Sequence, residues 1–370
     1  MNRYDNRKEL LRMVQKYLAG KATPAEETFL KAYYDFFEQD EAVLQNLRNE
    51  EKRLLGQKME QGFWEKVDRW EHQRVRPLWP RIAAAASVLI MLSIGFYAVL
   101  HNKHTTENKV AKIIPPGANG AILTLANGHK IVLEKTRNGQ VAAGISKAND
   151  SLLVYTNAAA TVAYNTLETP EGKQYAVELP DGSKAWLNAA SSLRYPTRFD
   201  KNNRTVELSG EAYFEVVHNS ASPFRVKTAV ETIEDIGTHF DVNAYADEPV
   251  QKTTLVEGLV KVTVGDESRK LQPGEQAAFA NNELTVKEVD VQEATAWQKG
   301  YFYFDHADIK EVMRQIARWY KVKVTYEGTI PQKQFKGKIY RNVNLQEALK
   351  ILAYFNVHFR IQGNTVIVSA

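Results

Sequence analysis

Cysteine is absent from this 370-residue chain. Its absence excludes disulfides, zinc–thiolate sites, iron–sulfur clusters and cysteine nucleophiles. A large excess of one charge is also missing, because 48 basic residues stand against 44 acidic residues. So close a balance gives no support for a general nucleic-acid binder, which would carry a basic stripe. We therefore expect no thiol chemistry and no direct contact with nucleic acid.

No apolar stretch follows the first residues of the sequence, so we expect no cleavable signal peptide. The long apolar stretch comes later, at residues 82–100, where IAAAASVLIMLSIGFYAVL contains no charge. A helix of this length spans about 28 Å, close to the roughly 30 Å hydrocarbon core of a bilayer. A core helix of a soluble domain would normally keep a polar stripe. The sequence therefore predicts a single transmembrane helix.

The flanking charges favour one orientation of this span. Five basic residues precede it closely and three follow it, namely Lys66, Arg69, Arg74, Arg76 and Arg81, then Lys103, Lys109 and Lys112. Because cytoplasmic flanks carry more Lys and Arg, residues 1–77 are expected in the cytoplasm. The rest of the chain is then expected on the other side of the membrane.

Residues 1–77 read as a bundle of three amphipathic α-helices, near 7–19, 23–37 and 41–70. The second helix has a clear start signal, because Thr23 at the N-cap and Glu26 form a capping box around Pro24. The second helix carries more apolar residues than a three-helix bundle of this size needs for itself, and one interpretation is that they form its core: Phe29, Leu30, Tyr33, Tyr34, Phe36 and Phe37. Alternatively, some of them are exposed and receive a partner, since a bundle of this size buries little by itself.

From residue 112 to residue 290 the hydrophobic period changes to two, and turn pairs such as Asn127-Gly128 and Asp181-Gly182 separate short strands. One internal echo recurs at an offset of 54 residues. It matches Pro116, Leu125, Gly128, Lys130 and Leu133 with Pro170, Leu179, Gly182, Lys184 and Leu187. This spacing predicts an all-β sandwich, barrel or solenoid.

Residues 298–370 predict a separate α+β domain made of two βαβ units. One helix is expected over Asp308–Trp319, and a second is expected after an N-cap at Asn344 with Glu347 at its third position. Ile309 and Glu311 of the first unit correspond to Leu345 and Glu347 of the second. The fold class is therefore multidomain, with a helical bundle, a membrane helix, an all-β region and an α+β domain.

Motifs that carry chemistry are missing. The chain has no glycine-rich phosphate loop, no G-x-S-x-G elbow and no H-E-x-x-H. His101 and His104 lack a third ligand and predict no metal site. Glu211 and Glu215, four apart on one strand, would lie roughly 13 Å apart, too far for a glycosidase pair; they read as a strand-edge residue and a solvated one. We expect no catalytic residue, no metal and no cofactor.

Several ordered motifs of the β region resemble the FecR family of anti-sigma factors. They are LPDGSKAWLNAASSLRYPTRF, VELSGEAYFEV, PFRVKT, IGTHFDVNAY and TTLVEGLVKV, between residues 179 and 262. PPGANGAILTLANGHKIVL at residues 115–133 resembles the Bacteroidetes-type branch. The C-terminal unit is similar to the short secretin/TonB N-terminal domain, and YLAGKATPAEETFLKAYYDFF at residues 17–37 is similar to the cytoplasmic segment of such proteins.

The resemblance implies a signalling relay through the inner membrane. The cytoplasmic helices would bind an extracytoplasmic-function sigma factor, and the periplasmic part would contact the signalling domain of a TonB-dependent outer-membrane transporter. An envelope protease would then release the sigma factor. The expected sigma-binding residues are Leu10, Leu11, Val14, Leu18, Phe29, Tyr33, Phe36 and Phe37. The expected transporter-binding residues are Phe335, Lys336, Lys338 and Tyr340.

Two other functions stay open at this point. A membrane-anchored periplasmic glycan-binding or scaffold protein would bind its ligand through residues 110–370 alone and would not need the first 75 residues. A membrane-tethered hydrolase would need a convergent polar cluster, which the sequence does not display.

Overall fold

The computed structural model describes residues 12–14, 16–17, 21–24, 26–27, 30, 113–155, 162–235, 237–330 and 332–369. The chain divides into two compact units, one made of Met1–Val43 with Ile114–Ala370 and the other of Leu44–Ile113. The predicted membrane helix at 82–100 and the predicted third helix at 41–70 lie outside the described residues. Within the described part of the chain, no helix is both long enough and apolar enough to cross a membrane.

The described part of the N-terminal segment contains the expected helix start. The Thr23 amide donates to Glu26 Oε2 at 2.8 Å, and the Glu26 amide donates to Thr23 Oγ1 at 3.2 Å. This reciprocal pair is the capping box that the sequence predicts. Hydrogen bonds from Lys16 and Thr23 lower the pKa of Glu26 to about 2.

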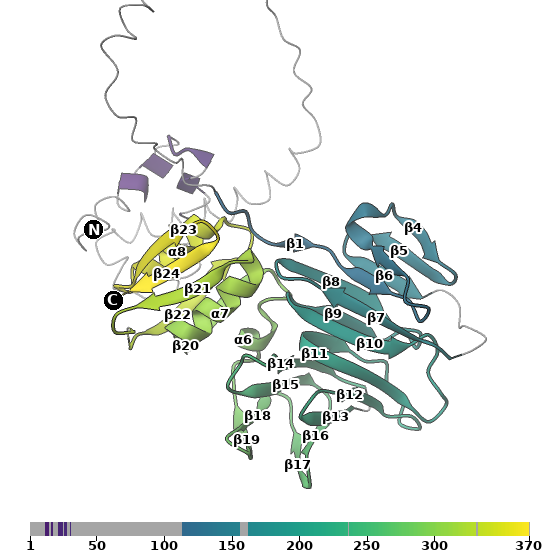
Figure 1. Cartoon of the computed structure of the whole chain (residues 1–370). Coiled ribbons are helices and arrows are strands. Elements are labelled where there is room, and N and C mark those ends of the chain that lie inside the picture. Colours follow the sequence, from purple (N-terminus) through teal and green to yellow (C-terminus); the bar gives the residue numbers. More distant parts are fainter. Residues whose placement is uncertain are drawn as a thin grey trace, which may run out of the picture. The chain divides into compact units, whose positions relative to one another are not determined.

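The β region, residues 113–289, contains a 19-stranded sheet system (Figure 1). Its strands are β1 (Ala118–Asn119), β2 (Ile122–Thr124), β3 (Lys130–Val132), β4 (Gly139–Ala142), β5 (Ile145–Asn149), β6 (Leu152–Tyr155), β7 (Tyr164–Thr169), β8 (Lys173–Glu178), β9 (Lys184–Leu187), β10 (Ser191–Pro196), β11 (Arg204–Glu215), β12 (Phe224–Lys227), β13 (Glu231–Asp235), β14 (His239–Ala244), β15 (Gln251–Glu257), β16 (Val260–Val264), β17 (Glu267–Leu271), β18 (Glu275–Ala280) and β19 (Glu283–Glu288). A short 3₁₀ helix, η1 (Leu133–Lys135), follows β3.

These strands form two layers that share β11. One layer has the neighbours β3-β2-β7-β10-β11-β12-β13-β16-β17, and the other has β4-β5-β6-β8-β9-β11-β14-β15-β18-β19. The change of layer occurs within β11 at Gly210, whose φ is +91°. A Cβ there would lie 2.5 Å from Ser191 Oγ, so only glycine fits this crossing. β11 thus continues through Gly210 as one strand.

A single apolar core fills the space between the two layers. Leu123, Leu193 and Val226 come from one layer, while Phe214 and Phe240 come from the other, and all five belong to one cluster of buried side chains. Their burial follows from the period-two alternation, which turns every second side chain of each strand inward. The region is therefore a β sandwich in which one strand belongs to both layers.

The 54-residue echo corresponds to a repeated turn. Gly128 donates its amide to Leu125 O at 2.8 Å, and Gly182 donates its amide to Leu179 O at 2.9 Å. The φ angles of the two glycines are +82° and +83°. The preceding Asn127 and Asp181 each accept from the backbone amide two residues on, at 2.9 and 3.0 Å. The same short pattern therefore builds the same turn twice.

The C-terminal region, residues 291–369, contains α6 (Val291–Thr295), β20 (Tyr301–Asp308), α7 (Ile309–Tyr320), β21 (Lys323–Glu327), β22 (Gln334–Tyr340), α8 (Leu345–Ala353), β23 (His358–Gln362) and β24 (Thr365–Ser369). The helices begin where the sequence predicts, because Asp308 and Asn344 accept from the amides of Glu311 and Glu347 at 2.8 and 2.9 Å.

The predicted pair of βαβ units needs a correction. A βαβ unit places its two strands in parallel in one sheet. Here β20 pairs with β22 in an antiparallel two-stranded sheet, and β21 pairs with β24, next to β23, in a second sheet. The order of elements along the chain is as expected, but the two strands of each unit lie in different sheets.

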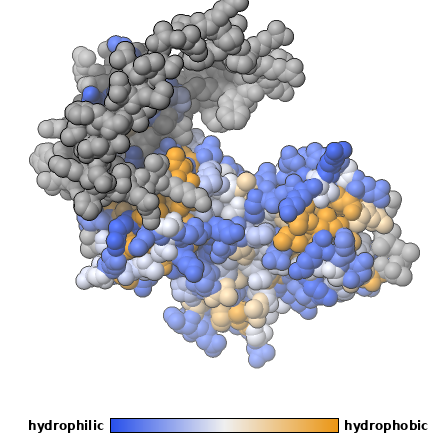
Figure 2. Space-filling view, turned by 45° about the horizontal axis from the view of Figure 1, so that its top comes forward, coloured by the Kyte–Doolittle hydropathy of each residue, from blue (hydrophilic) through white to orange (hydrophobic). Residues whose placement is uncertain are grey.

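The described surface is mostly hydrophilic, with separate apolar areas (Figure 2). The large apolar side chains that are exposed are scattered over several elements: Ile113, Val162, Tyr164, Val217, Val230 and Leu259. Scattered exposed apolar residues are normal for a folded protein and by themselves mark no site.

Candidate functional site

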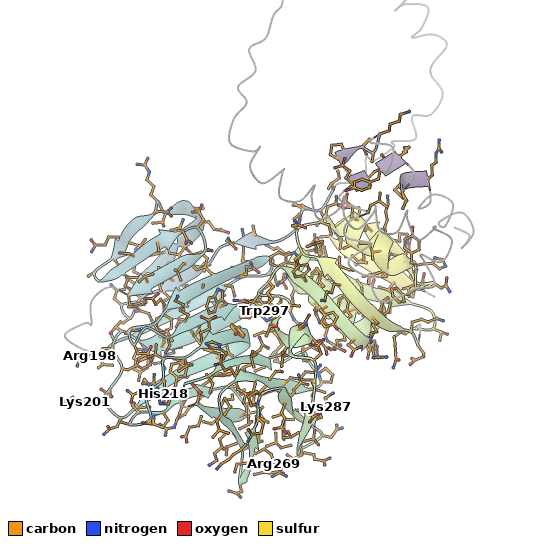
Figure 3. The ribbon with its side chains drawn as sticks, turned by 180° about the vertical axis from the view of Figure 1, so that it is seen from behind. Arg198, Lys201, His218, Arg269, Lys287 and Trp297 are labelled. Carbon is orange, nitrogen blue, oxygen red and sulfur yellow. The ribbon has the colours of Figure 1, made fainter. Side chains whose placement is uncertain are left out.

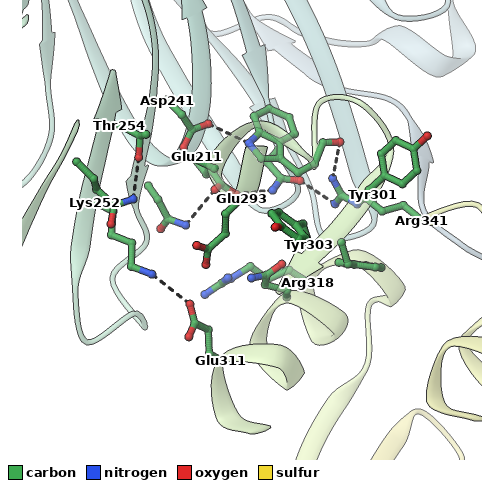
Figure 4. Close-up of a pocket in the computed structure, with 17 residues that line it drawn as sticks. Glu211, Asp241, Lys252, Thr254, Glu293, Tyr301, Tyr303, Glu311, Arg318 and Arg341 are labelled. Carbon is green, nitrogen blue, oxygen red and sulfur yellow. Dashed lines mark hydrogen bonds and ion pairs between the residues drawn. The ribbon is translucent and has the colours of Figure 1, made fainter. Parts of the chain in front are cut away.

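The outer face of the second sandwich layer is covered by the C-terminal region, and the contact between them is polar. Strands β9, β11, β14 and β15 face α6, β20 and α7 around a cavity of about 60 Å³ (Figure 4). We call this contact the junction and define it by Asn188, Glu211, Asp241, Trp297, Arg318 and Arg341. Trp297 marks its place in the molecule in Figure 3. The β region and the C-terminal region thus contact each other through buried polar side chains.

Trp297 anchors the C-terminal region on the sandwich. It follows α6, and its indole is only 7% exposed. Its Nε1 donates to Asp241 Oδ1 on β14 at 2.9 Å. An indole of this size contributes apolar burial, while its single N–H fixes the orientation of the ring. One side chain therefore combines packing with a specific polar contact to β14.

Arg341 combines one hydrogen bond across the junction with contacts inside the C-terminal region. The guanidinium donates to Asn188 Oδ1 at 2.8 Å and to the Trp297 carbonyl at 3.2 Å. It also lies over the ring of Trp319, 3.8 Å from the ring centre. Trp319 in turn donates its Nε1 to the Arg341 carbonyl at 2.7 Å. The residue comes directly after β22, so it ties that strand to β9 of the sandwich.

Glu211 is the acidic centre of the junction. Its carboxylate accepts from Asn188 Nδ2 and, at 3.0 Å, from Asn243 Nδ2. It lies inside β11, with β9 on one side and β14 on the other, and is 8% exposed. The expectation that Glu211 sits at a strand edge is therefore wrong. Glu215 is only partly buried and lies outside this cluster.

Burial raises the pKa of both junction acids. For Glu211, burial raises the pKa, while the hydrogen bond from Asn188 and the charges of Arg318 and Arg341 lower it. For Asp241, burial and then the Glu211 charge hold the pKa well above its usual value. A raised pKa means that ionisation weakens the folded junction, so the contribution of these groups to stability is lost as pH rises. Burial also lowers the pKa of Arg341 to about 10, which leaves its guanidinium charged at neutral pH.

A second group of charges lines the rim of the junction. The guanidinium of Arg318 on α7 donates hydrogen bonds to Glu248 Oε1 at 2.6 Å and to Asp247 Oδ1 at 2.8 Å. The guanidinium lies 3.8 Å from the centre of the Tyr245 ring. Arg314, one turn earlier, donates to Glu248 Oε2 at 2.7 Å. These contacts hold α7 against the segment that follows β14.

The opposite rim is formed by Lys252 of β15 and Glu311 of α7, whose Nζ and Oε1 lie 3.2 Å apart (Figure 4). Glu293 of α6 also lines the cavity, and its burial raises its pKa. Ion pairs of this half-exposed kind contribute modestly to stability and are screened by salt. The rim therefore adds orientation more than binding energy.

The junction is built for contact between two regions and not for a bound small molecule. Its cavity of about 60 Å³ is well below the several hundred Å³ that drug-sized ligands occupy. Among the described residues, no group of three or more acidic, His or Cys side chains could hold a metal ion. The buried charges at the centre of the junction are hydrogen-bonded to neutral polar groups. Glu211 accepts from two asparagine amides, Asp241 accepts from the Trp297 indole, and Arg341 donates to Asn188 and a backbone carbonyl. Buried polar groups need such partners.

Among the expected sigma-binding residues, the structure describes only Val14, which is buried at 5% exposure. The remaining seven lie outside the described residues: Leu10, Leu11, Leu18, Phe29, Tyr33, Phe36 and Phe37. The eight residues are therefore neither brought together nor separated by the structure.

The expected transporter-binding residues all lie on β22. Phe335 is fully buried and packs on Phe355, with ring centres 4.7 Å apart. It is a core residue, so the expectation that its side chain contacts a partner is wrong. Lys336, Lys338 and Tyr340 alternate with the buried residues of the strand and lie on its opposite face. They contact Asp305, Tyr303 and Tyr301 of β20, respectively.

The junction residues were not among the residues predicted from the sequence to form a site. Asn188, Asp241, Trp297, Arg318 and Arg341 belong to segments that are far apart in the chain. One local signal was available, since GEAYFEV and HFDVNAY each place an acid within a run of apolar and aromatic residues. An acid in such a run is expected to be buried and paired. The identity of their partners, Asn188 and Asn243 for Glu211 and Trp297 for Asp241, needs the three-dimensional fold.

Comparison with known proteins gives a consistent result for both regions. The family model described as FecR protein matches residues 165–261, and the one described as FecR, C-terminal matches residues 301–368. Two crystal structures of a proposed anti-sigma factor from Parabacteroides distasonis are similar to the chain at 28% identity, with TM-scores of 0.52 and 0.53. They cover 55% and 56% of this chain and 97% and 98% of their own. No curated protein matches.

Proposed function

Because this chain is a FecR family protein, we propose that it is an anti-sigma factor that relays a signal from the cell envelope to a sigma factor. The observation that carries the proposal is the joint match of both FecR domains, together with the likeness to nearly the whole Parabacteroides distasonis structure. That structure is described as an anti-sigma factor. No catalytic role is proposed, since the family and the matched structure are those of regulators.

The proposed topology follows the apolar segment of the sequence. Residues 1–77 bind an extracytoplasmic-function sigma factor in the cytoplasm, and residues 82–100 cross the inner membrane. The β region and the C-terminal region lie in the periplasm. The helical segment suits a sigma factor because an amphipathic helix can lay its apolar face in a groove of a partner. An envelope protease would release the sigma factor once the periplasmic part has received its signal.

The C-terminal region is the proposed receiver of the signal from a TonB-dependent transporter. Strand β22 pairs with β20 on one side, and among the described residues no strand pairs with its other edge. An unpaired strand edge can accept an extended strand from a partner. Lys336, with a side chain 49% exposed, lies on this strand and offers a positive charge beside it. Lys338 and Tyr340 complete the proposed contact, while the buried Phe335 supports the strand from the core.

The experiment compares the full-length chain with a Phe29→Glu/Phe36→Glu variant in cells that carry a sigma-dependent reporter. We expect the variant to lose co-purification with the sigma factor by at least tenfold and to uncouple the reporter from the signal. Lys21→Glu, an exposed substitution in the same segment, is the control and should keep both. Sigma binding that survives in the double variant would contradict the proposed face.

The same cells distinguish a relay from a glycan-binding or scaffold protein. Deletion of residues 1–77 should abolish control of the reporter if the chain is a relay. A scaffold would keep its function without these residues, and the isolated residues 110–370 would bind a glycan. Reporter control that is unchanged by the deletion would overturn the relay.

A further inference from the structure

The segment Ile114–Gly120 runs between the C-terminal region and the β region, and we call it the strap. It contains β1, which lies beside β8 in Figure 1. Residues 101–112, which would connect the predicted membrane helix to the strap, lie outside the described residues. The strap therefore follows directly after Ile113, the first described residue beyond the predicted span.

The C-terminal region holds the first residue of the strap through the start of α8. The Leu345 amide donates to the Ile114 carbonyl at 3.0 Å, and the Ile114 amide donates to Gln346 Oε1 at 3.2 Å. The first amides of a helix have no partner within the helix. Ile114 supplies one of these partners, and its side chain is buried at 8% exposure.

The middle of the strap fits closely against α7. A Cβ on Gly117 would lie 2.7 Å from the indole of Trp319 and 2.8 Å from the Gly172 carbonyl. Trp319 is buried and fixed by its hydrogen bond to Arg341, so its ring has little room to shift. The absence of a side chain at Gly117 is what allows this approach.

The end of the strap is held by the β region. The Ala118 amide donates to Gly172 O at 2.9 Å, and the Gly120 amide donates to Gln174 O at 3.0 Å. β1 pairs with β8 over only two residues, Ala118 with Lys173 and Asn119 with Gln174. Gly172 itself donates its amide to the Arg318 carbonyl at the end of α7, at 2.7 Å. Both regions thus meet the strap at the same turn.

These contacts make the strap dependent on the junction. If the C-terminal region leaves the sandwich, Ile114 is drawn away with α8 or loses both hydrogen bonds, and Gly117 loses Trp319. The two-residue pairing of β1 would then remain alone. Pairing of this length is too short to persist without support, since even a complete hairpin is marginal in water.

We propose that the strap is an autoinhibitory contact that withholds its own backbone, Ile114–Gly120, from a protease until the C-terminal region is displaced. This inference rests on the proposed relay function. A protease needs an extended backbone that is free of other hydrogen bonds, and the docked strap uses its backbone in contacts with α8 and β8. Displacement of the C-terminal region at the junction frees the strap for cleavage.

The first test measures amide hydrogen exchange in the purified full-length protein. Arg341→Met weakens the junction and should accelerate exchange of the Ile114, Ala118 and Gly120 amides by at least tenfold. Gly117→Val should do the same at Ala118 and Gly120. The Gly182 amide, which lies in a turn inside the sandwich, should keep its protection in both variants. If the C-terminal region is displaced in Arg341→Met but the amides of the strap exchange at the unchanged rate, the proposal is wrong.

The second test pins the strap in cells. The chain contains no cysteine, so Ala118→Cys with Lys173→Cys creates one disulfide pair at two residues that are strand partners. The oxidised pair should reduce signal-dependent cleavage and reporter induction at least fivefold, and reduction should restore both. The single Ala118→Cys variant is the control. If the reporter is fully induced although the strap is pinned, and residues 1–77 still control the reporter, the proposed role of the strap is wrong but the relay stands. If residues 1–77 do not control the reporter, the relay itself is wrong.

Discussion

The interior of the sandwich and the junction are both buried, but they are held by different forces. The interior contains apolar side chains from both layers, including the stacked rings of Phe214 and Phe240, whose centres are 5.2 Å apart. The junction contains Glu211, Asp241 and Arg341. Apolar burial contributes about 25 cal/mol per Å² and has no partner specificity. A buried pair of charges adds little net stability, but removal of one partner lowers the stability strongly because the other charge stays buried without compensation.

This difference indicates which contact can open. A sandwich core separates only when the whole region unfolds, because each apolar side chain contacts many others. A polar junction can separate as a unit, since water can replace its hydrogen bonds on both sides. The β region is therefore the stable support, and the junction is the place where the C-terminal region can leave it. Four predictions test this division.

The largest expected effect is in the sandwich core. Phe214 is fully buried on β11 and contacts Phe240 and Phe224. Phe214→Ala should lower the free energy of unfolding by about 4 kcal/mol, because it removes a large apolar group and leaves a cavity. Denaturant unfolding followed by near-ultraviolet circular dichroism measures the change. Val217→Ala, at a residue 47% exposed, should change it by less than about 0.5 kcal/mol.

The second prediction concerns the junction. Arg341→Met keeps the apolar stem but removes the charge that faces Glu211, at a cost of about 3 kcal/mol. The loss should appear as an early, separate transition of the C-terminal region, while the midpoint of the β region stays in place. Arg360→Met removes an exposed ion pair with Glu327 and should have almost no effect. A single merged transition that shifts as a whole would contradict the division into support and releasable region.

The third prediction uses pH. Glu231 on β13 is 2% exposed and accepts one hydrogen bond, from Thr253 Oγ1 at 3.0 Å. Burial raises its pKa to about 7 from 4.5. Because the folded pKa is raised, its contribution to stability is complete below about pH 4.5 and is lost as pH rises through 7.

Glu231→Gln keeps the acceptor but cannot ionise. It should therefore raise the free energy of unfolding by about 2 to 3 kcal/mol at pH 8 and leave it unchanged near pH 4. Glu234→Gln on the same strand is the matched control, since Glu234 is partly exposed and paired with Arg225. Equal effects of the two substitutions at pH 8 would show that burial of Glu231 is not the cause.

The smallest expected effect is at a helix end. Asp308 accepts the Glu311 amide at the start of α7, and Asp308→Ala should cost about 1 kcal/mol. The loss should lie in the transition of the C-terminal region. Asp266→Ala, at an exposed turn of the β region, is the control. A loss in the transition of the β region instead would show that the two regions unfold together.

Local features of the fold were predictable from the sequence because their causes are local. The turn around Gly128 and Gly182 follows from the residues at the turn itself, and the N-caps at Asp308 and Asn344 follow from residues within one helical turn. The alternation of apolar residues also predicted which strand faces would be buried.

The pairing of distant segments was not predictable in the same way. The two βαβ units have the right order of elements, but tertiary packing places β20 with β22 and β21 with β24. The junction likewise joins Asn188, Asp241 and Arg341 across more than 150 positions of the chain. No local pattern specifies a partner at that separation, so the hydrogen-bond partners of Glu211 could not be predicted from the sequence.

The length of β11 has a mechanical consequence. Its 12 residues extend over roughly 40 Å at about 3.3 Å per residue. Its first residue, Arg204, is bonded to Asp181, and Glu211 of the junction lies in its second half. A rod that is bonded into both layers prevents them from sliding past each other. A pull on the C-terminal region is thus resisted by the sandwich as a rigid body, and the yielding must occur at the surface where the two regions touch.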